Sequence, residues 1–202
     1  MGRKASEKNR KARTGKTKKW AEMLLPSLQN VSLKDLTIDD IAQKMNKSKS
    51  TVYQYFKTKQ EVLTYVAEIR IEKLNRYRDE LLKNNDNFTV IYQNIIEIIC
   101  EGIQGISAHF LHELKENYPD AWKVIRSFLD QMLGDLRKFY VEGIANKVFH
   151  PVSVELLVSL DEHFAINIMT NKRFLKEHKI PLETLVKDYL FMKFSGLNVG
   201  FS

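Results

Sequence analysis

The chain has 202 residues, of which 44% are hydrophobic and 28% charged, so it can bury a substantial core and is neither fibrous nor broadly disordered. Its 8 glycines and 4 prolines are too few for the turns of an all-β fold, and its single cysteine excludes a disulfide framework and a cysteine-based zinc site. Residues 1–60 hold 15 Lys and Arg against 5 Asp and Glu, whereas residues 61–202 hold 17 against 20. A secretory signal pattern is not seen, which predicts a cytoplasmic location.

The chain starts with a basic segment. Residues 1–19 carry nine Lys and Arg and one acidic residue, without apolar periodicity. We predict a flexible basic arm over residues 1–16, which is either a solvated tail or a segment that binds a polyanion. Helical spacing begins near Thr17, a candidate N-cap, and runs to Leu28. Pro26 removes a backbone hydrogen bond, so this helix should kink or stop early.

Two short helices joined by a tight turn are predicted next. Thr37 is suited to cap a helix that runs to Met45, and Ser48 is suited to cap a second one that reaches about Phe56. Asn46 tolerates the left-handed backbone that such a turn needs. The pair forms a helix-turn-helix. The second helix buries its apolar positions, so its polar side chains face outward as candidates for reading DNA bases: Lys49, Ser50, Thr51, Tyr53 and Gln54.

The remaining residues follow helical periods. A helix is predicted from Lys59 to Leu82, a loop at 84–87, and a helix over 88–111. The last is long enough for a membrane span, but polar residues on one stripe, at 93, 97, 101 and 104, argue against one. Pro119 is suited to begin a helix that reaches about Asn146, and two more follow near 151–172 and 181–197. The chain is therefore predicted to be all-α, with about nine helices.

The last two helices carry more apolar surface than one buried stripe requires. A two-fold partner that uses the same helices is the simplest cover for the excess, and deep burial within one chain is the alternative. The candidate dimer contacts are Leu157, Leu190, Phe191 and Phe194.

The stretch "TIDDIAQKMNKSKSTVYQYFKTKQEVL", residues 37–63, resembles the DNA-binding signature of the TetR family of bacterial transcription regulators. The similarity is clearest from Ser48 to Leu63, and "ENYPDAW" resembles the break before a long ligand-domain helix of that family. Asn46 and Lys47 depart from its usual glycine and small apolar residue in the turn. Pro26 is also unusual for its first helix.

The resemblance implies a homodimer, most often a repressor, that binds a palindromic DNA operator. A small apolar molecule is expected to release the protein from the operator. The resemblance divides the chain into the arm (1–16), a DNA-binding domain (17–60) and a ligand-binding and dimerisation domain (61–202). Phosphate contacts are expected at Thr37, Ser48, Lys57 and Lys59, and minor-groove contacts of the arm at Arg10 and Arg13. No cofactor or membrane partner is expected.

The aromatic and methionine residues of the second domain are either plain core or the lining of an apolar ligand pocket, which the resemblance favours: Phe110, Trp122, Phe128, Met132, Phe164 and Met169. His109, His112 and Glu113 lie close together on a helix, but a metal site needs three or four converging ligands, so we predict none. No nucleophile elbow, phosphate loop or carboxylate pair indicates an enzyme. A helical interaction or lipid-carrier module with a degenerate helix-turn-helix is the remaining alternative.

Overall fold

The computed structural model describes residues 10–82 and 87–201. The prediction of an all-α fold is confirmed, since the described chain holds helices, turns and one isolated β-bridge. The helices are α1 (Gly15–Leu24), α2 (Ile38–Lys44), α3 (Lys49–Tyr53), α4 (Lys59–Leu74), α5 (Tyr77–Leu81), α6 (Phe88–Ile103), α7 (Ala108–Asn117), α8 (Pro119–Ala145), α9 (Val154–His163), α10 (Lys172–His178) and α11 (Leu182–Leu197).

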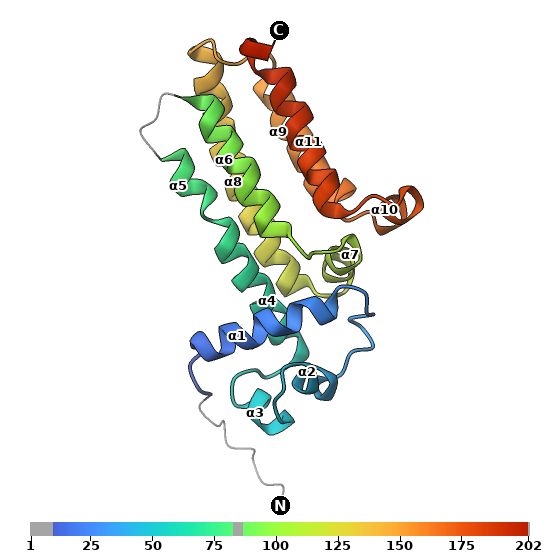
Figure 1. Cartoon of the computed structure of the whole chain (residues 1–202). Helices are drawn as coiled ribbons and strands as arrows, with labels where there is room; N and C mark the ends of the chain where they lie inside the picture. The colour runs from blue at the N-terminus through green and yellow to red at the C-terminus, as the bar shows by residue number, and fades with distance from the viewer. Residues whose placement is uncertain (1–9, 83–86, 202) are drawn as a thin grey trace, which may run out of the picture.

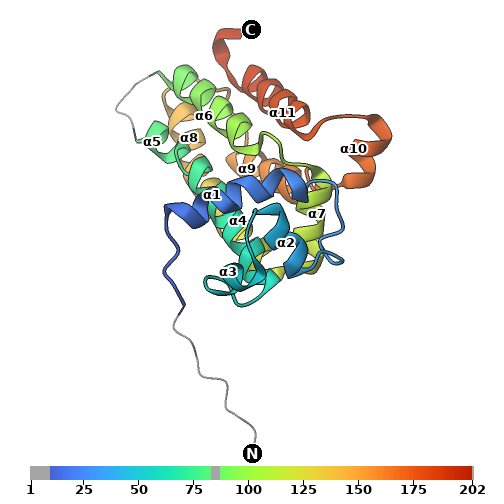
Figure 2. The same cartoon turned by 60° about the horizontal axis from the view of Figure 1, so that its bottom comes forward.

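The helices form two groups that share α4. In Figure 1, α1, α2 and α3 gather at the end of the molecule that carries the N-terminal segment, and α4 rises from them. α4 packs mainly against α8, α6 packs against α11, and α9 packs against α8. α1 crosses α4 in both views (Figures 1 and 2). Because α4 belongs to both groups, a displacement of this helix changes both.

The predicted helix-turn-helix is present, and its ends are capped as the sequence indicates. The Thr37 hydroxyl accepts the Asp40 N–H at 3.1 Å and begins α2, while the Ser48 hydroxyl accepts the Thr51 N–H at 3.2 Å and begins α3. Between them Asn46 has φ 53°, and the Lys47 N–H donates to the Ala42 carbonyl at 2.9 Å. This is the Schellman arrangement, in which asparagine takes the position of the usual glycine.

Lys47 fits this turn because its ammonium lies 5.4 Å from the centre of the Trp20 ring, and the side chain is not driven into the core. The first helix departs from prediction at its start. It begins at Gly15 with Thr14 as N-cap, and Thr17 is the third helical residue, fully buried. It ends at Leu24 and continues as a 3-10 turn over Leu25–Leu28, so the early stop predicted from Pro26 is confirmed.

Two long helices predicted from periodicity are interrupted. The helix expected to reach Leu82 ends at Leu74, and α5 starts anew at Tyr77, which is fully buried and donates its hydroxyl to Asp135 on α8 at 2.9 Å. No proline or glycine lies at this break, which falls at Asn75 and Arg76, just before the residue that contacts α8. The helix expected over 88–111 breaks at Gly105, which has φ 73° and so adopts a conformation that favours glycine.

Gly102 has a different role from Gly105. A Cβ atom at Gly102 would lie 2.0 Å from a methyl carbon of Leu74, so the absence of a side chain lets α4 approach α6. The helix expected over 151–172 is α9 followed by a π-helical turn over Phe164–Ile168, and α10 had not been expected. Among the described helices, none combines the length and apolar character that crossing a bilayer requires.

Candidate functional site

The outward face of α3 holds the predicted base-reading side chains. Ser50, Tyr53 and Gln54 are exposed, and Tyr53 presents 45% of its surface although it is aromatic. Thr51 is half-buried, and its hydroxyl forms a hydrogen bond of 2.8 Å with the hydroxyl of Ser48. The ammonium of Lys49 pairs with Asp39 at 2.7 Å, an interaction that raises the pKa of Lys49. The buried Val52 anchors this face from behind, so the helix presents a polar ridge to solvent.

The four residues predicted to touch phosphates have unequal freedom. Thr37 and Ser48 use their hydroxyls as helix caps. The backbone N–H of Lys57 donates to Glu61 at 2.6 Å, which leaves its exposed side chain directed to solvent. Lys59 points elsewhere: its ammonium donates to the carbonyls of Leu33 and Lys34 at 2.8 and 2.9 Å. In this structure Lys59 is thus bonded to the backbone, and its phosphate contact stays a prediction.

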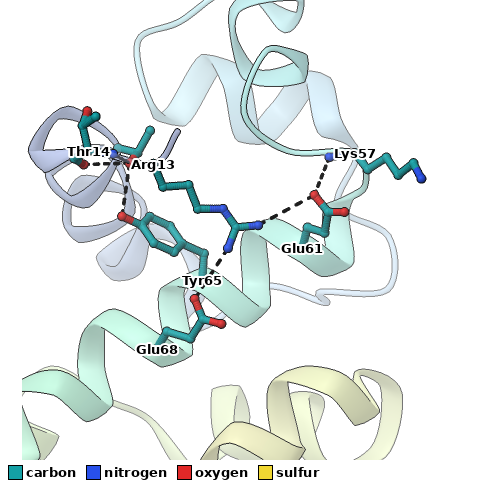
Figure 3. Close-up of polar contacts among 7 residues, drawn as sticks. Arg13, Thr14, Lys57, Glu61, Tyr65 and Glu68 are labelled. Atoms are coloured by element: carbon teal, nitrogen blue, oxygen red, sulfur yellow. Dashed lines mark hydrogen bonds and ion pairs between the residues drawn. The ribbon is translucent and has the colours of Figure 1, made fainter. Parts of the chain in front are cut away.

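The two arginines predicted for the minor groove also differ. Arg10 is exposed and lies outside any helix. Arg13 is folded back onto α4, where its guanidinium lies 3.8 Å from Glu61 and 3.6 Å from Glu68 (Figure 3). The structure thus does not present Arg13 as a free cation. The part of the arm that precedes residue 10 lies outside the described residues.

An apolar cavity lies behind the helix-turn-helix. Its volume is about 140 Å³. Its walls come from α4, α6, α7, α8, α9 and α11, and Leu25 adds a contact from the first group of helices. All six residues predicted for a pocket line it: Phe110, Trp122, Phe128, Met132, Phe164 and Met169. The α4 residues of this wall, such as Val66 and Ile71, were not among the predicted pocket residues, although apolar residues recur at helical spacing along α4.

Few polar side chains reach the cavity wall. Thr170 donates to the Ile166 carbonyl at 2.7 Å, and Asp161 accepts from Tyr189 at 2.8 Å. Arg70 donates to the Gln104 carbonyl, while its Nε is buried without a partner, and burial lowers the pKa of this guanidinium. An interior of this composition accommodates an apolar molecule and offers little to a strongly polar one.

A buried charge network beside the cavity was missed by the sequence analysis. Lys193 on α11 and Asp161 on α9 form an ion pair of 2.5 Å with side chains 7% and 8% exposed. Tyr140 donates to the same carboxylate at 2.9 Å. Burial lowers the pKa of Lys193 and raises that of Tyr140. The signal was present, since Asp161 follows Leu157 by four residues and precedes Phe164 by three, on an apolar stripe.

The structure corrects the predicted dimer contacts. Leu157 and Phe194 are buried within the chain, 7% and 2% exposed, and Phe194 stacks on Tyr92 with ring centres 4.8 Å apart. Leu190 is half-buried and lines the cavity. Phe191 is 63% exposed, as a contact residue should be. The other exposed apolar side chains of α9 and α11, which lie side by side in Figure 1, are Leu156, Leu160 and Met192.

No group of three or more His, Cys, Asp or Glu side chains among the described residues is arranged to hold a metal ion. His109 hydrogen-bonds to the Val31 carbonyl at 3.0 Å, and Glu113 lies 3.8 Å from Lys172. These contacts connect α7 to its neighbours. Cys100 is a half-buried free thiol, and burial raises its pKa.

The structure thus joins a capped helix-turn-helix with an exposed polar ridge to an apolar cavity through one helix, α4. Residues 29–66 match the family model described as bacterial regulatory proteins, tetR family. This part of the chain therefore carries the DNA-binding signature of TetR-family transcription regulators. The intact caps and this match leave no support for a degenerate helix-turn-helix.

Several known proteins are similar to this chain. The chain is 20% identical over 162 residues to the uncharacterized HTH-type transcriptional regulator YvaF of Bacillus subtilis, covering 80% of this chain and 85% of that one. In fold it is similar to the TetR-family regulator PfmR of Thermus thermophilus, with TM-score 0.63 and 16% identity over 93% and 98% of the chains. It is also similar to FadR of Bacillus subtilis in complex with stearoyl-CoA, with TM-score 0.61 and 17% identity over 90% and 97%.

Proposed function

We propose that this regulator binds a palindromic operator as a homodimer, represses transcription in the cytoplasm, and is released by a small apolar molecule. The observation that carries the proposal is the position of α4. Its first turn follows the reading end of the helix-turn-helix, while Val66, Arg70 and Leu74 further along form cavity wall. A ligand that prefers one position of α4 shifts the population of DNA-binding conformations. The FadR structure, which holds stearoyl-CoA, supports an acyl chain as the occupant.

The dimer matters because one helix-turn-helix reads one half-site. Two recognition helices must be about 34–36 Å apart to enter successive turns of the same face of DNA. A small tilt of α4 in both protomers therefore spoils both half-sites together. A coupling of about 1.4 kcal/mol already changes operator affinity tenfold. The apolar surface of α9 and α11 supports the two-fold pairing.

Gln54 and Lys57 are expected to have separable roles. Gln54→Ala should relax the base preference at one position of the operator. The binding free energy that separates the favoured base pair from the others should fall by about 1–3 kcal/mol, because a glutamine amide pairs with an adenine edge. Lys57→Ala should weaken all sequences alike and reduce the salt dependence by about one phosphate contact. Titrations of the selected operator and of its single-base variants measure both effects. A change of base preference in Lys57→Ala alone would contradict this orientation of α3.

The proposal is tested by titrating a duplex selected from a randomised library, at several salt concentrations and with or without stearoyl-CoA. Operator affinity should fall with salt, with a log–log slope of about −0.9 per neutralised phosphate. Stearoyl-CoA should weaken operator binding, and operator should weaken stearoyl-CoA binding by the same factor. Salt-independent DNA binding would contradict the DNA role. Equal stearoyl-CoA affinity with and without operator would exclude this molecule as the releasing ligand.

A further inference from the structure

The guanidinium of Arg13 lies close to two aromatic rings and two carboxylates. Its central carbon lies 5.1 Å from the centre of the Phe56 ring and 5.0 Å from that of Tyr65. Its nitrogens lie 3.6 Å from the carboxylate of Glu68 and 3.8 Å from that of Glu61 (Figure 3). The two ring centres are 5.5 Å apart and the rings are tilted by 48°, so the rings contact each other and the cation lies against both. Arginine suits this position, because its planar group can contact rings and pair with carboxylates at once.

The backbone around Arg13 is fixed to the same place. The Lys11 N–H donates to the carbonyl of Gln54, at the end of α3, at 2.9 Å. On the other side of Arg13, Thr14 begins α1, and the hydroxyl of Thr17 lies 3.1 Å from that of Tyr65. The segment from Lys11 to Thr17 therefore lies across the C-terminal end of the recognition helix and the first turns of α4.

This environment does not suit a phosphate contact by Arg13 itself. Two carboxylates already compensate its charge, and the side chain is 35% exposed. To reach DNA it would have to leave both rings and both acids. By contrast, Arg10 is exposed and directly precedes the residue that is bonded to Gln54. Further basic residues, Arg3, Lys4 and Lys8, precede it in the sequence.

We propose that Arg13 is a positioning residue that fixes the root of the basic arm beside the recognition helix. Arg10, which is exposed and adjoins the residue bonded to Gln54, then meets DNA next to the base pairs that Gln54 reads. This inference rests on the DNA binding proposed above. The arm's contribution to DNA affinity then depends on the contacts of Arg13, which lie entirely within the protein. Weakening these contacts should lower DNA affinity even where the substitution makes the protein more positive.

The first test is a double-mutant cycle on the full-length chain, with the library-selected duplex titrated at about 0.1 M salt. Deletion of residues 2–10 should lower affinity on the order of tenfold, since it removes Arg10 and the other basic residues before it that can neutralise phosphates. Arg13→Ala should lower the affinity of the full chain by a similar factor, yet change the shortened chain less than about twofold. Equal losses in both chains would overturn the proposal, because they mean that Arg13 acts without the arm.

The second test separates positioning from net charge. Glu68→Gln removes one anchor of Arg13, whereas Glu72→Gln, one turn further on α4, removes a carboxylate that pairs with Lys18 at 2.8 Å. Simple electrostatics predicts tighter DNA binding for both variants. Positioning predicts weaker DNA binding for Glu68→Gln alone. It also predicts that Arg13→Lys binds DNA as weakly as Arg13→Ala, because lysine keeps the charge but not the planar group.

The outcomes distinguish the two proposals. Tighter binding by Glu68→Gln, or full recovery in Arg13→Lys, would overturn the positioning role and leave DNA binding intact. A wild-type chain that binds no duplex in a salt-dependent manner would overturn the proposed function, and the positioning role with it. Unfolding midpoints of the Arg13 variants within about a degree of the wild type would show that lost DNA affinity is not lost folding.

Discussion

Replacing Phe191 with glutamate is expected to give monomers that no longer hold a full operator. Phe191 is 63% exposed on α11, and its neighbour Met192 is 67% exposed. A two-fold interface uses the same surface of both chains, so one substitution puts two carboxylates into an apolar contact. The free energy needed to bury an unpaired charge there exceeds the free energy of association that a small dimer interface supplies. Loss of the second half-site should lower operator affinity by about 10²- to 10⁴-fold.

Light scattering and operator titration of the same preparation check this result. The matched control is Val90→Glu on α6, which changes an exposed valine (38%) outside the α9 and α11 surface and should remain dimeric. Retained helical circular dichroism shows that the chain still folds. A Phe191→Glu protein of unchanged mass and operator affinity would mean that the partner, if there is one, uses another surface.

Removing either member of the Asp161–Lys193 pair is expected to destabilise the fold severely. Lys193→Met leaves a carboxylate, and Asp161→Asn leaves an ammonium, each almost without solvent and without its counter-charge. The loss of one partner of a buried pair costs about 3–5 kcal/mol. The double variant removes both charges, and the amide that replaces the carboxylate can still accept from one tyrosine hydroxyl through its oxygen and donate to the other through its nitrogen. It should therefore be more stable than either single variant.

Urea unfolding at fixed protein concentration measures these free energies, because a dimer's stability depends on concentration. The exposed Lys18–Glu72 pair is the control: its distance is 2.8 Å, but its side chains are 37% and 61% exposed. Glu72→Gln should therefore change stability by less than about 1 kcal/mol. If the losses of the two single variants simply add in the double variant, the two buried charges do not interact.

The helix-turn-helix could be predicted from sequence because its determinants are local. Thr37 and Ser48 cap helices through bonds to residues three positions away, and Asn46 adopts its left-handed backbone within the turn itself. The early end of α1 follows from Pro26 in the same way. Such features depend on a few neighbouring residues, so a short stretch of sequence contains all the information they need.

The aromatic residues of the cavity were also identified in advance, since helical spacing shows which side chains face inward. Spacing alone does not distinguish a filled core from a cavity. That difference depends on how far apart the helices pack, which the close approach of Leu74 to Gly102 and the break at Gly105 help to set. Periodicity also failed to find the break before Tyr77, because the apolar spacing continues across it and Tyr77 is buried against α8.

The sequence by itself thus determined the helical class, the caps and turn of the helix-turn-helix, and the uneven charge, which all depend on local chemistry or composition. The tertiary structure decided which partner each long side chain selects. Lys59 reaches two backbone carbonyls, Arg13 reaches the carboxylates of α4, and Phe194 turns inward to stack on Tyr92. The physical reason is that a long or amphipathic side chain has several partners within reach, and only the packed helices determine which of them is nearest.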